Sequence, residues 1–304
     1  MSVEAEPAPD LSIARAAGPR RSPAGGFSVI ALWALYVLTL RQHLHGRRWM
    51  VVAGLFLLPA GLAVLIRATA RDAPAVGVEF LLAFMFIPQA LLPLVALVYA
   101  SGIIQDEQED QTLTYLLIRP ISRWALFLVK LSATLTTTIL LTAVFTALTY
   151  AVIYAGGDKP AAEVAGRCLK AVAIHCVAVG TYCCLFGLIG LYTKRALVAG
   201  ILYAAVIEGL LANLPFGLRF VTVIYYARIM AYRSLDFTFT DHGRREDMAA
   251  AAWQIDRKGD PDLLGHPQFG TCLIVLLVAG LACAGVSALL CSRREFHVKT
   301  PESS

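Results

Sequence analysis

The sequence predicts an all-α polytopic membrane protein, with six transmembrane helices preceded by an amphipathic helix at the membrane interface. Hydrophobic residues make up 58% of the 304 residues and charged residues only 15%, whereas a soluble domain is roughly half apolar and a quarter charged. Long apolar runs also recur along the chain, separated by short polar turns. One globular core could not bury this much apolar surface, but a bilayer can cover it.

Six apolar runs approach the roughly 20 residues that a bilayer crossing requires. The predicted spans are about 49–66, 80–104, 124–154, 171–192, 196–214 and 271–290. Pro88 and Pro93 lie inside the second span, where we expect a kink or break because proline removes a helical hydrogen bond. Gly180, Gly187 and Gly190 in the fourth span would permit close helix packing.

The segments outside the spans differ in composition. Residues 27–46 are apolar as far as Leu40 and then polar, so this segment is too short to cross and predicts an interfacial helix. Residues 1–26 are rich in Ala, Pro, Gly and Arg and do not follow the pattern of a cleaved signal peptide. They predict a disordered cytoplasmic tail, and residues 297–304 predict a second cytoplasmic tail.

Basic residues beside the spans predict the orientation. Arg48 precedes the first span, Lys194 and Arg195 form a short turn, and Arg293 follows the last span. Because Lys and Arg are enriched in short cytoplasmic segments, we expect both termini in the cytoplasm and the chain in the cytoplasmic (inner) membrane. Residues 216–269 would then form an extracytoplasmic loop, whose first part could be an amphipathic or re-entrant helix.

The most informative segment, QDEQEDQTLTYLLIRPISR, joins the second and third spans at residues 105–123. Hydrocarbon cannot host its four carboxylates at 106–110, so they must lie in water. The leucines that follow have helical spacing, Pro120 ends that helix, and Ser122 could cap the third span. This pattern predicts a short cytoplasmic helix tied to two membrane helices, so that a soluble partner pressing on it would move both.

This segment resembles the hallmark segment of ABC-2 type permeases, in which an acidic pair, Gly-Thr-Leu, a short apolar helix, Arg/Ser-Pro-x-Ser-Arg and a later Lys join the second and third spans. The matching positions are Glu107, Glu109, Thr112, Leu113, Leu116, Leu117, Arg119, Pro120, Ser122, Arg123 and Lys130. Gln111 replaces the family's glycine. Residues 27–46 resemble the family's elbow helix, and the resemblance covers about residues 27–296. It is closest to the subfamily that includes permeases of multicopper-enzyme maturation systems.

The resemblance implies the permease subunit of an ABC transporter, and an exporter, that moves an unidentified substrate with energy from a separate ATPase. That ATPase would contact residues 105–123, and a second permease copy would complete a homodimer or heterodimer in the membrane lipid. The chain has no Gly-x-x-x-x-Gly-Lys-Ser/Thr loop of its own, so we expect a transport subunit rather than an enzyme, with no cofactor and ATP used by the partner. A net charge of only +5 argues against nucleic acid.

Three polar residues inside predicted spans are candidate pathway residues: Glu208, Gln89 and His175. Each has a structural alternative. Glu208 could be a protonated or paired structural carboxylate near the outer interface, His175 a packing or interfacial histidine, and Gln89 a partner for a backbone carbonyl that Pro88 leaves free.

Motifs for catalysis or metal binding are missing from the sequence. The seven cysteines form no Cys-x-x-Cys pair, and neither His-Glu-x-x-His nor Gly-x-Ser-x-Gly occurs. We therefore expect no metal site and no catalytic residues. The alternative function is an integral membrane enzyme or anchoring subunit that uses the loop 216–269 to bind an extracytoplasmic partner.

Overall fold

The computed structural model describes residues 29–46, 48–70, 73–103, 122–157, 159–193, 195–213, 217–241, 244–253 and 265–293. The predicted tails (1–26 and 297–304) and residues 104–121 lie outside this part of the chain.

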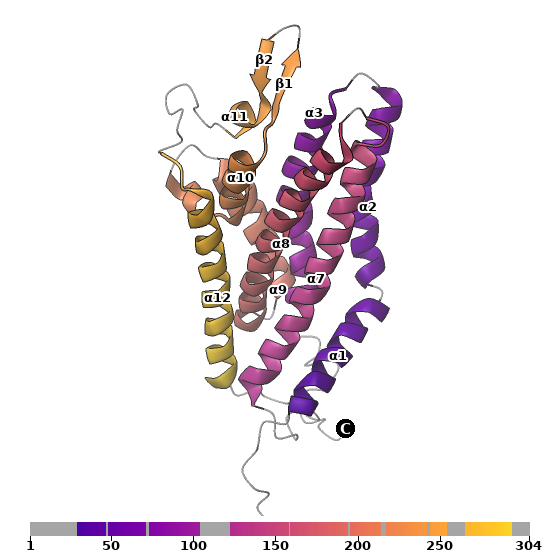
Figure 1. The fold of residues 1–304 in the computed structure, drawn as a ribbon. Helices are drawn as coiled ribbons and strands as arrows, with labels where there is room; N and C mark the ends of the chain where they lie inside the picture. Colours follow the sequence, from indigo (N-terminus) through magenta and orange to yellow (C-terminus); the bar gives the residue numbers. More distant parts are fainter. Residues whose placement is uncertain are drawn as a thin grey trace, which may run out of the picture.

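Six helical segments of the described chain are long and apolar enough to cross a membrane, and Figure 1 shows them running side by side. They are Arg48–Thr69 (α2), Ala75–Ala100 (α3, Ala75–Glu79; η2, Phe80–Leu91; α4, Leu92–Ala100), Arg123–Ile153 (α7), Ala161–Tyr192 (α8), Ala196–Asn213 (α9, Ala196–Tyr203; η3, Ala204–Leu210; η4, Leu211–Asn213) and Phe269–Arg293 (α12). The predicted all-α membrane fold with six spans is confirmed.

Two predicted spans have different bounds in the structure. The second crossing begins at Ala75 rather than residue 80 and its helix ends at Ala100 rather than 104, and α8 begins at Ala161 rather than 171. The prediction stopped each span at its first charged residues. In the structure, Glu79 in one extra turn pairs with Arg167 in the other, so both helices continue through these charges. Glu163 pairs instead with Lys159, and Lys170 donates to the carbonyl of Ser234.

The second crossing changes its hydrogen-bond pattern around its prolines. Residues Phe80–Leu91 form a π-helix that contains Pro88, and the N–H of Leu92 still donates to the carbonyl of Ile87, five residues earlier. The α pattern resumes in α4, where Pro93 lies in the first turn, a position that requires no N–H donor. The expected kink or break therefore takes the form of a π segment. This segment accommodates the missing backbone N–H of Pro88 without ending the helix.

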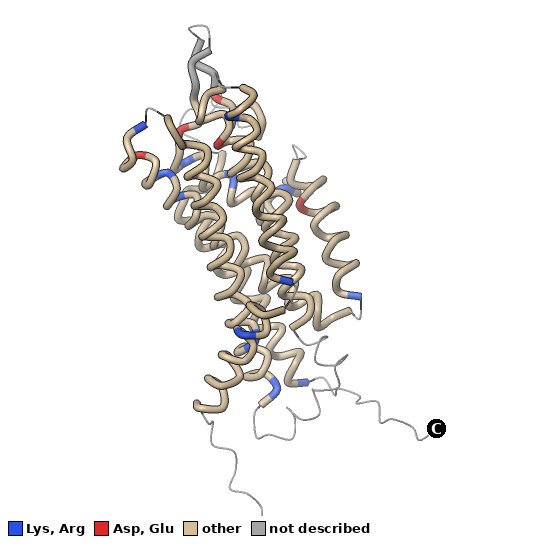
Figure 2. The backbone as a smooth tube through the Cα atoms, turned by 90° about the vertical axis from the view of Figure 1, so that its right-hand side faces the viewer, with Lys and Arg blue, Asp and Glu red and all other residues tan. Residues whose placement is uncertain are grey.

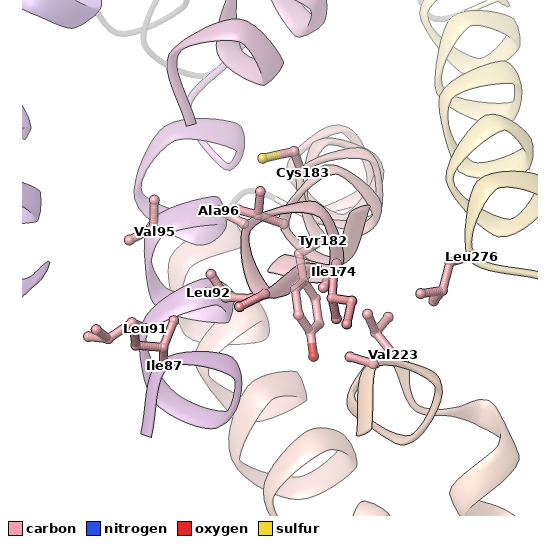
Figure 3. Packing of buried hydrophobic residues seen from close by; sticks show 14 of the residues in the cluster. Ile87, Leu91, Leu92, Val95, Ala96, Ile174, Tyr182, Cys183, Val223 and Leu276 are labelled. Carbon is pink, nitrogen blue, oxygen red and sulfur yellow. The ribbon is translucent and has the colours of Figure 1, made fainter. Parts of the chain in front are cut away.

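The long helix α8 lies at the centre of the bundle and packs against α4, α7, α9, α10 (Val223–Ser234) and α12. Figure 3 shows buried apolar side chains of the hydrophobic core, among them Leu92 of α4, Tyr182 of α8, Val223 of α10 and Leu276 of α12. The outward face of α12 is apolar as well, with Ile274, Val278 and Leu281 exposed, as expected for a surface that lipid covers.

The helix α1 (Val29–His45) begins at the end of the bundle where α12 finishes and packs along the first half of α7 (Figure 1). The hydroxyl of Tyr36 donates to Oγ1 of Thr136 at 3.0 Å, and Nδ1 of His43 lies 3.3 Å from Oγ1 of Thr137. The predicted helix before the first span is present; its place at a membrane interface stays a prediction.

The region predicted as a loop, 216–269, contains regular structure at the other end of the bundle. A short 3₁₀ helix η5 (Gly217–Val221) leads to α10, which is followed by an antiparallel hairpin of β1 (Thr238–Asp241) and β2 (Arg244–Asp247) and by α11 (Met248–Ala252). The sequence reading anticipated a helix near α10 but not the hairpin. Most of α10 is buried, including Ile224, Ala227 and Met230, so it belongs to the bundle rather than to a free loop.

Charged residues are distributed unevenly between the two ends. Among the described residues, the end that holds the start of α1 and the end of α12 carries basic but no acidic side chains, and Figure 2 shows the acidic residues only in the opposite half. The basic residues at the first end are Arg41, Arg48, Arg123, Lys130, Arg195 and Arg293.

One glycine of α8 marks a backbone contact that no side chain would fit. A Cβ on Gly190 would lie 2.7 Å from the carbonyl oxygen of Ser101, in the turn after α4. A Cβ on Gly180 would lie 3.9 Å from Leu135, an ordinary contact. Of the two, only Gly190 therefore needs to be glycine for packing.

We expect Gly190→Ala to lower the stability of the purified protein by about 1–3 kcal/mol, because α8 must move away from Ser101. Thermal unfolding in detergent measures the change. Gly180→Ala, in the same helix, is the matched control and should leave the Tm unchanged or slightly higher. Equal Tm values for the two variants would contradict the close contact.

Candidate functional site

Most of the predicted coupling segment lies outside the described residues, including Glu107, Glu109, Thr112, Leu113, Leu116, Leu117, Arg119 and Pro120. Its two flanks are described, and they are held together. The buried ammonium of Lys130, in α7, donates to the carbonyl of Ile103 at 3.5 Å, just before the segment. The carbonyl of Arg123, just after it, accepts from Sγ of Cys291 in α12 at 3.4 Å. The segment therefore begins and ends on three connected helices.

Ser122 occupies the N-cap position of α7 with extended backbone, as predicted, but its side chain makes no capping hydrogen bond. Its carbonyl accepts from the N–H of Leu126 at 3.1 Å. The prediction that its hydroxyl caps the helix is therefore wrong. The backbone alone makes the turn from the segment into α7.

Glu208 lies in the π segment η3 and is fully buried. Its Oε1 accepts from the N–H of Val223 at 2.9 Å and from the Tyr203 hydroxyl at 3.0 Å, and its Oε2 accepts from the N–H of Ile224 at 3.0 Å. A carboxylate at a helix N-terminus satisfies free N–H groups and is stabilised by the helix dipole. These contacts favour the structural alternative, in which Glu208 holds the start of α10 to the fifth crossing.

Gln89 bonds a side chain that the sequence analysis did not single out. Its Oε1 accepts from Nη2 of Arg228 at 2.7 Å, and Nη1 of Arg228 donates to Oδ1 of Asn213 at 3.0 Å. Arg228 is almost fully buried, and burial lowers its pKa, although an arginine keeps its charge at neutral pH. Gln89 thus bonds α10 rather than a carbonyl near Pro88, and α10 brings Gln89 and Glu208 into one polar region.

His175 lies apart from that region. It is fully buried in α8, its Nδ1 lies 3.2 Å from Oγ1 of Thr146, and its ring is 5.6 Å from that of Phe84. These contacts match a packing histidine that bonds a neighbouring helix. Glu208, Gln89 and His175 therefore form no single cluster, and a pathway role for any of them stays a prediction.

A buried ion pair that the sequence did not predict joins α3 to α8. Glu79, in α3, is fully buried, and Nε and Nη2 of Arg167 in α8 each lie 2.9 Å from its Oε2. The hydroxyl of Tyr150 donates to Oε1 at 2.7 Å, and that of Tyr154 donates to Oε2. Burial and the Glu79 carboxylate raise the pKa of Tyr154, so its phenol stays protonated and acts as a donor.

This network ties three crossings to the region after α10, because Nη2 of Arg167 also donates to the carbonyl of Asp236 at 3.0 Å. The sequence shows only that Glu79 stands at the start of one apolar run and that Arg167 precedes another apolar run. Hydropathy cannot show that the two meet.

We expect Glu208→Gln to destabilise the protein by about 1–3 kcal/mol, because the amide presents NH₂ to one of two backbone N–H donors. Tyr203→Phe, which removes one bond and leaves both α10 contacts, should cost less. Thermal unfolding compares the two. If Glu208→Gln impaired transport while leaving the Tm at the wild-type value, the carboxylate would act on substrate instead.

We expect Glu79→Gln and Arg167→Gln each to cost about 3–5 kcal/mol, because each leaves a buried group without its partner. The double variant should cost less than the sum of the two, which a double-mutant cycle of unfolding free energies measures. Additive effects would show that the pair is not coupled. Glu163→Gln, which removes an exposed pair with Lys159 near the same end of α8, is the control and should leave the Tm unchanged.

Comparison with known families agrees with this architecture. A family model described as "ABC-2 family transporter protein" matches residues 44–211, more than half of the chain. The match includes the predicted coupling segment and the crossings on both sides of it. No curated protein matches the chain. Together with the six apolar helices, the match identifies a multi-pass transport permease of the membrane, and the chain belongs to the ABC-2 family of transporter proteins.

Proposed function

We propose that this permease is an exporter driven by a separate ATPase that binds residues 105–123. ATP binding and hydrolysis in that partner would move the segment and, through it, the helices on either side. The observation that carries this proposal is the family match over residues 44–211, which has the acidic segment between its second and third crossings. A second permease copy and a second ATPase would complete the transporter by analogy with the family.

The contacts at the flanks support transmission of such a movement. Lys130 joins α7 to the end of α4, Cys291 joins α12 to the start of α7, and Gly190 brings α8 against Ser101. A displacement of the segment would therefore act on several helices rather than on one. The second crossing then continues from α4 through the π segment to Glu79 at the opposite end.

The charge distribution supports a cytoplasmic position for this end. Its described charged residues are all basic, and Lys and Arg near span ends favour the cytoplasmic side. The first described residue of α1 and the last of α12 lie at the same end (Figure 1). We propose that both termini and the coupling segment face the cytoplasm, where ATP is available, and that the membrane is the inner membrane.

The proposal is tested by combining the purified permease with a candidate ATPase subunit and measuring ATP turnover. Reversing both charges of the acidic pair, Glu107→Lys with Glu109→Lys, should abolish the stimulation of ATP turnover by the permease, because the partner loses its contact. Membrane insertion and Tm should stay at wild-type values. Glu163→Lys, an exposed reversal at the opposite end, is the matched control and should keep the stimulation.

Full stimulation by the double reversal would contradict the proposed coupling segment. The orientation has its own test, which is labelling of a cysteine placed at residue 109 in a variant without native cysteines. We expect a membrane-impermeant thiol reagent to reach it in inverted vesicles but not in intact cells.

A further inference from the structure

A small cavity lies among residues of α10, the end of the fifth crossing and the segment before α12, at the end of the bundle away from the coupling segment. Its volume is about 20 Å³, and its described lining includes Arg219, Tyr225, Arg228, Trp253 and His266. A space of this size holds one water molecule or one small polar group. The described lining contains two arginines and no carboxylate.

Arg228 has donor capacity that the protein does not use. Only 6% of its surface is exposed, and its two terminal nitrogens donate to the neutral amide oxygens of Gln89 and Asn213. Its Nε is buried and has no hydrogen-bond partner among the residues that the structure describes. The carboxylate of Glu208 acts on Arg228 electrostatically but forms no salt bridge with it, and its oxygens accept from Tyr203 and from the start of α10. A buried guanidinium with a free N–H requires an acceptor.

A second guanidinium is held at the same cavity. The Arg219 guanidinium carbon lies 5.3 Å from the ring centroid of Tyr225 and 5.9 Å from that of Phe220, so two aromatic faces position it. It pairs with no carboxylate in the described part of the chain. The Tyr225 hydroxyl lies 3.1 Å from Nδ1 of His266, which brings two further polar groups to the lining.

We propose that this cavity binds a single oxyanion group, a phosphate or a carboxylate, between Arg219 and Arg228. Two permanent cations and the free N–H of Arg228 suit planar or tetrahedral oxyanions, for which arginine provides directed donors. The small volume admits one such group and not a whole organic molecule. The group can come from a free ion or from the head of an anionic lipid, since the cavity lies at the outer end of the bundle.

This proposal goes beyond transport, because binding requires neither nucleotide nor an ATPase. Its test uses the full chain in nanodiscs of zwitterionic phosphatidylcholine, without any partner. Trp253 lines the cavity. In a variant with Trp33→Phe, Trp49→Phe and Trp124→Phe, Trp253 is the one tryptophan left, so the fluorescence emission reports on the cavity. Inorganic phosphate and, separately, acetate are titrated at constant ionic strength while Trp253 emission and Tm are recorded.

We expect a saturable change in emission and a rise in Tm with at least one of the two anions. Arg219→Gln should weaken the apparent affinity by roughly tenfold or more, because one of two charged partners is lost. Arg195→Gln, at the other end of the fifth crossing, is the matched control and should bind as the wild type does. Arg228→Gln should also abolish binding, but it removes contacts to Gln89 and Asn213, so the folded Arg219→Gln variant decides the test.

Nanodiscs that contain phosphatidylglycerol distinguish the sources. If this lipid alone raises the Tm and suppresses the response to phosphate, the bound group is a lipid headgroup. If the response to phosphate is unchanged, the ligand is a free ion. The proposal fails if phosphate, acetate and phosphatidylglycerol all leave emission and Tm unchanged, or if Arg219→Gln binds as tightly as the wild type. Either result would mean that the cavity holds only water.

Discussion

An ionised group that lacks a partner is unfavourable both in hydrocarbon and in the packed interior of a helix bundle. The arrangement of this bundle depends on the partners that its buried charged groups find. Glu79 meets Arg167, Glu208 meets the first turn of α10, and Lys130 meets the carbonyl of Ile103. The first contact joins residues 88 positions apart, and the other two join residues 15 and 27 positions apart. Since the apolar faces of the helices pack about equally well against lipid, these polar contacts specify which helices become neighbours.

Close contacts between helices lie at both ends of the bundle. At one end, Lys130 of α7 bonds the carbonyl of Ile103, and Gly190 of α8 packs against Ser101, both just before residues 105–123. Cys291 of α12 bonds the carbonyl of Arg123, at the end of the same segment. At the other end, Arg167 and Glu208 hold the region after the fifth crossing against the bundle. The second crossing runs between the two ends and carries the π segment with Pro88. π segments often occur at functional positions, where they change side-chain direction without ending the helix.

The helix α10 explains why the region after the fifth crossing is part of the bundle. With 12 residues it is too short to cross a bilayer, yet it is buried against α8 and α12. Glu208 accepts hydrogen bonds from its first turn, and Gln89 accepts one from Arg228 in its middle. Arg228 of this helix lies inside the protein, with the side-chain amides of Asn213 and Gln89 as partners. A buried, positively charged cavity beside a membrane bundle is consistent with recognition of an anionic group, and it does not depend on how transport is powered.

Sequence alone was sufficient for the number of crossings, for the break in pattern near Pro88 and for the position of the acidic segment between the second and third crossings. These features depend on contiguous composition, because the bilayer selects each apolar run by its own length and hydropathy. The extra helical turns at Glu79 and Arg167 and the hydrogen-bond partners of Gln89 and Glu208 were decided only by the tertiary structure. A charged residue ends a span or continues it according to whether a partner lies nearby, and here the partner of Glu79 is 88 residues away in the chain. No local pattern records that distance, so pairing across the bundle determined which charges were buried.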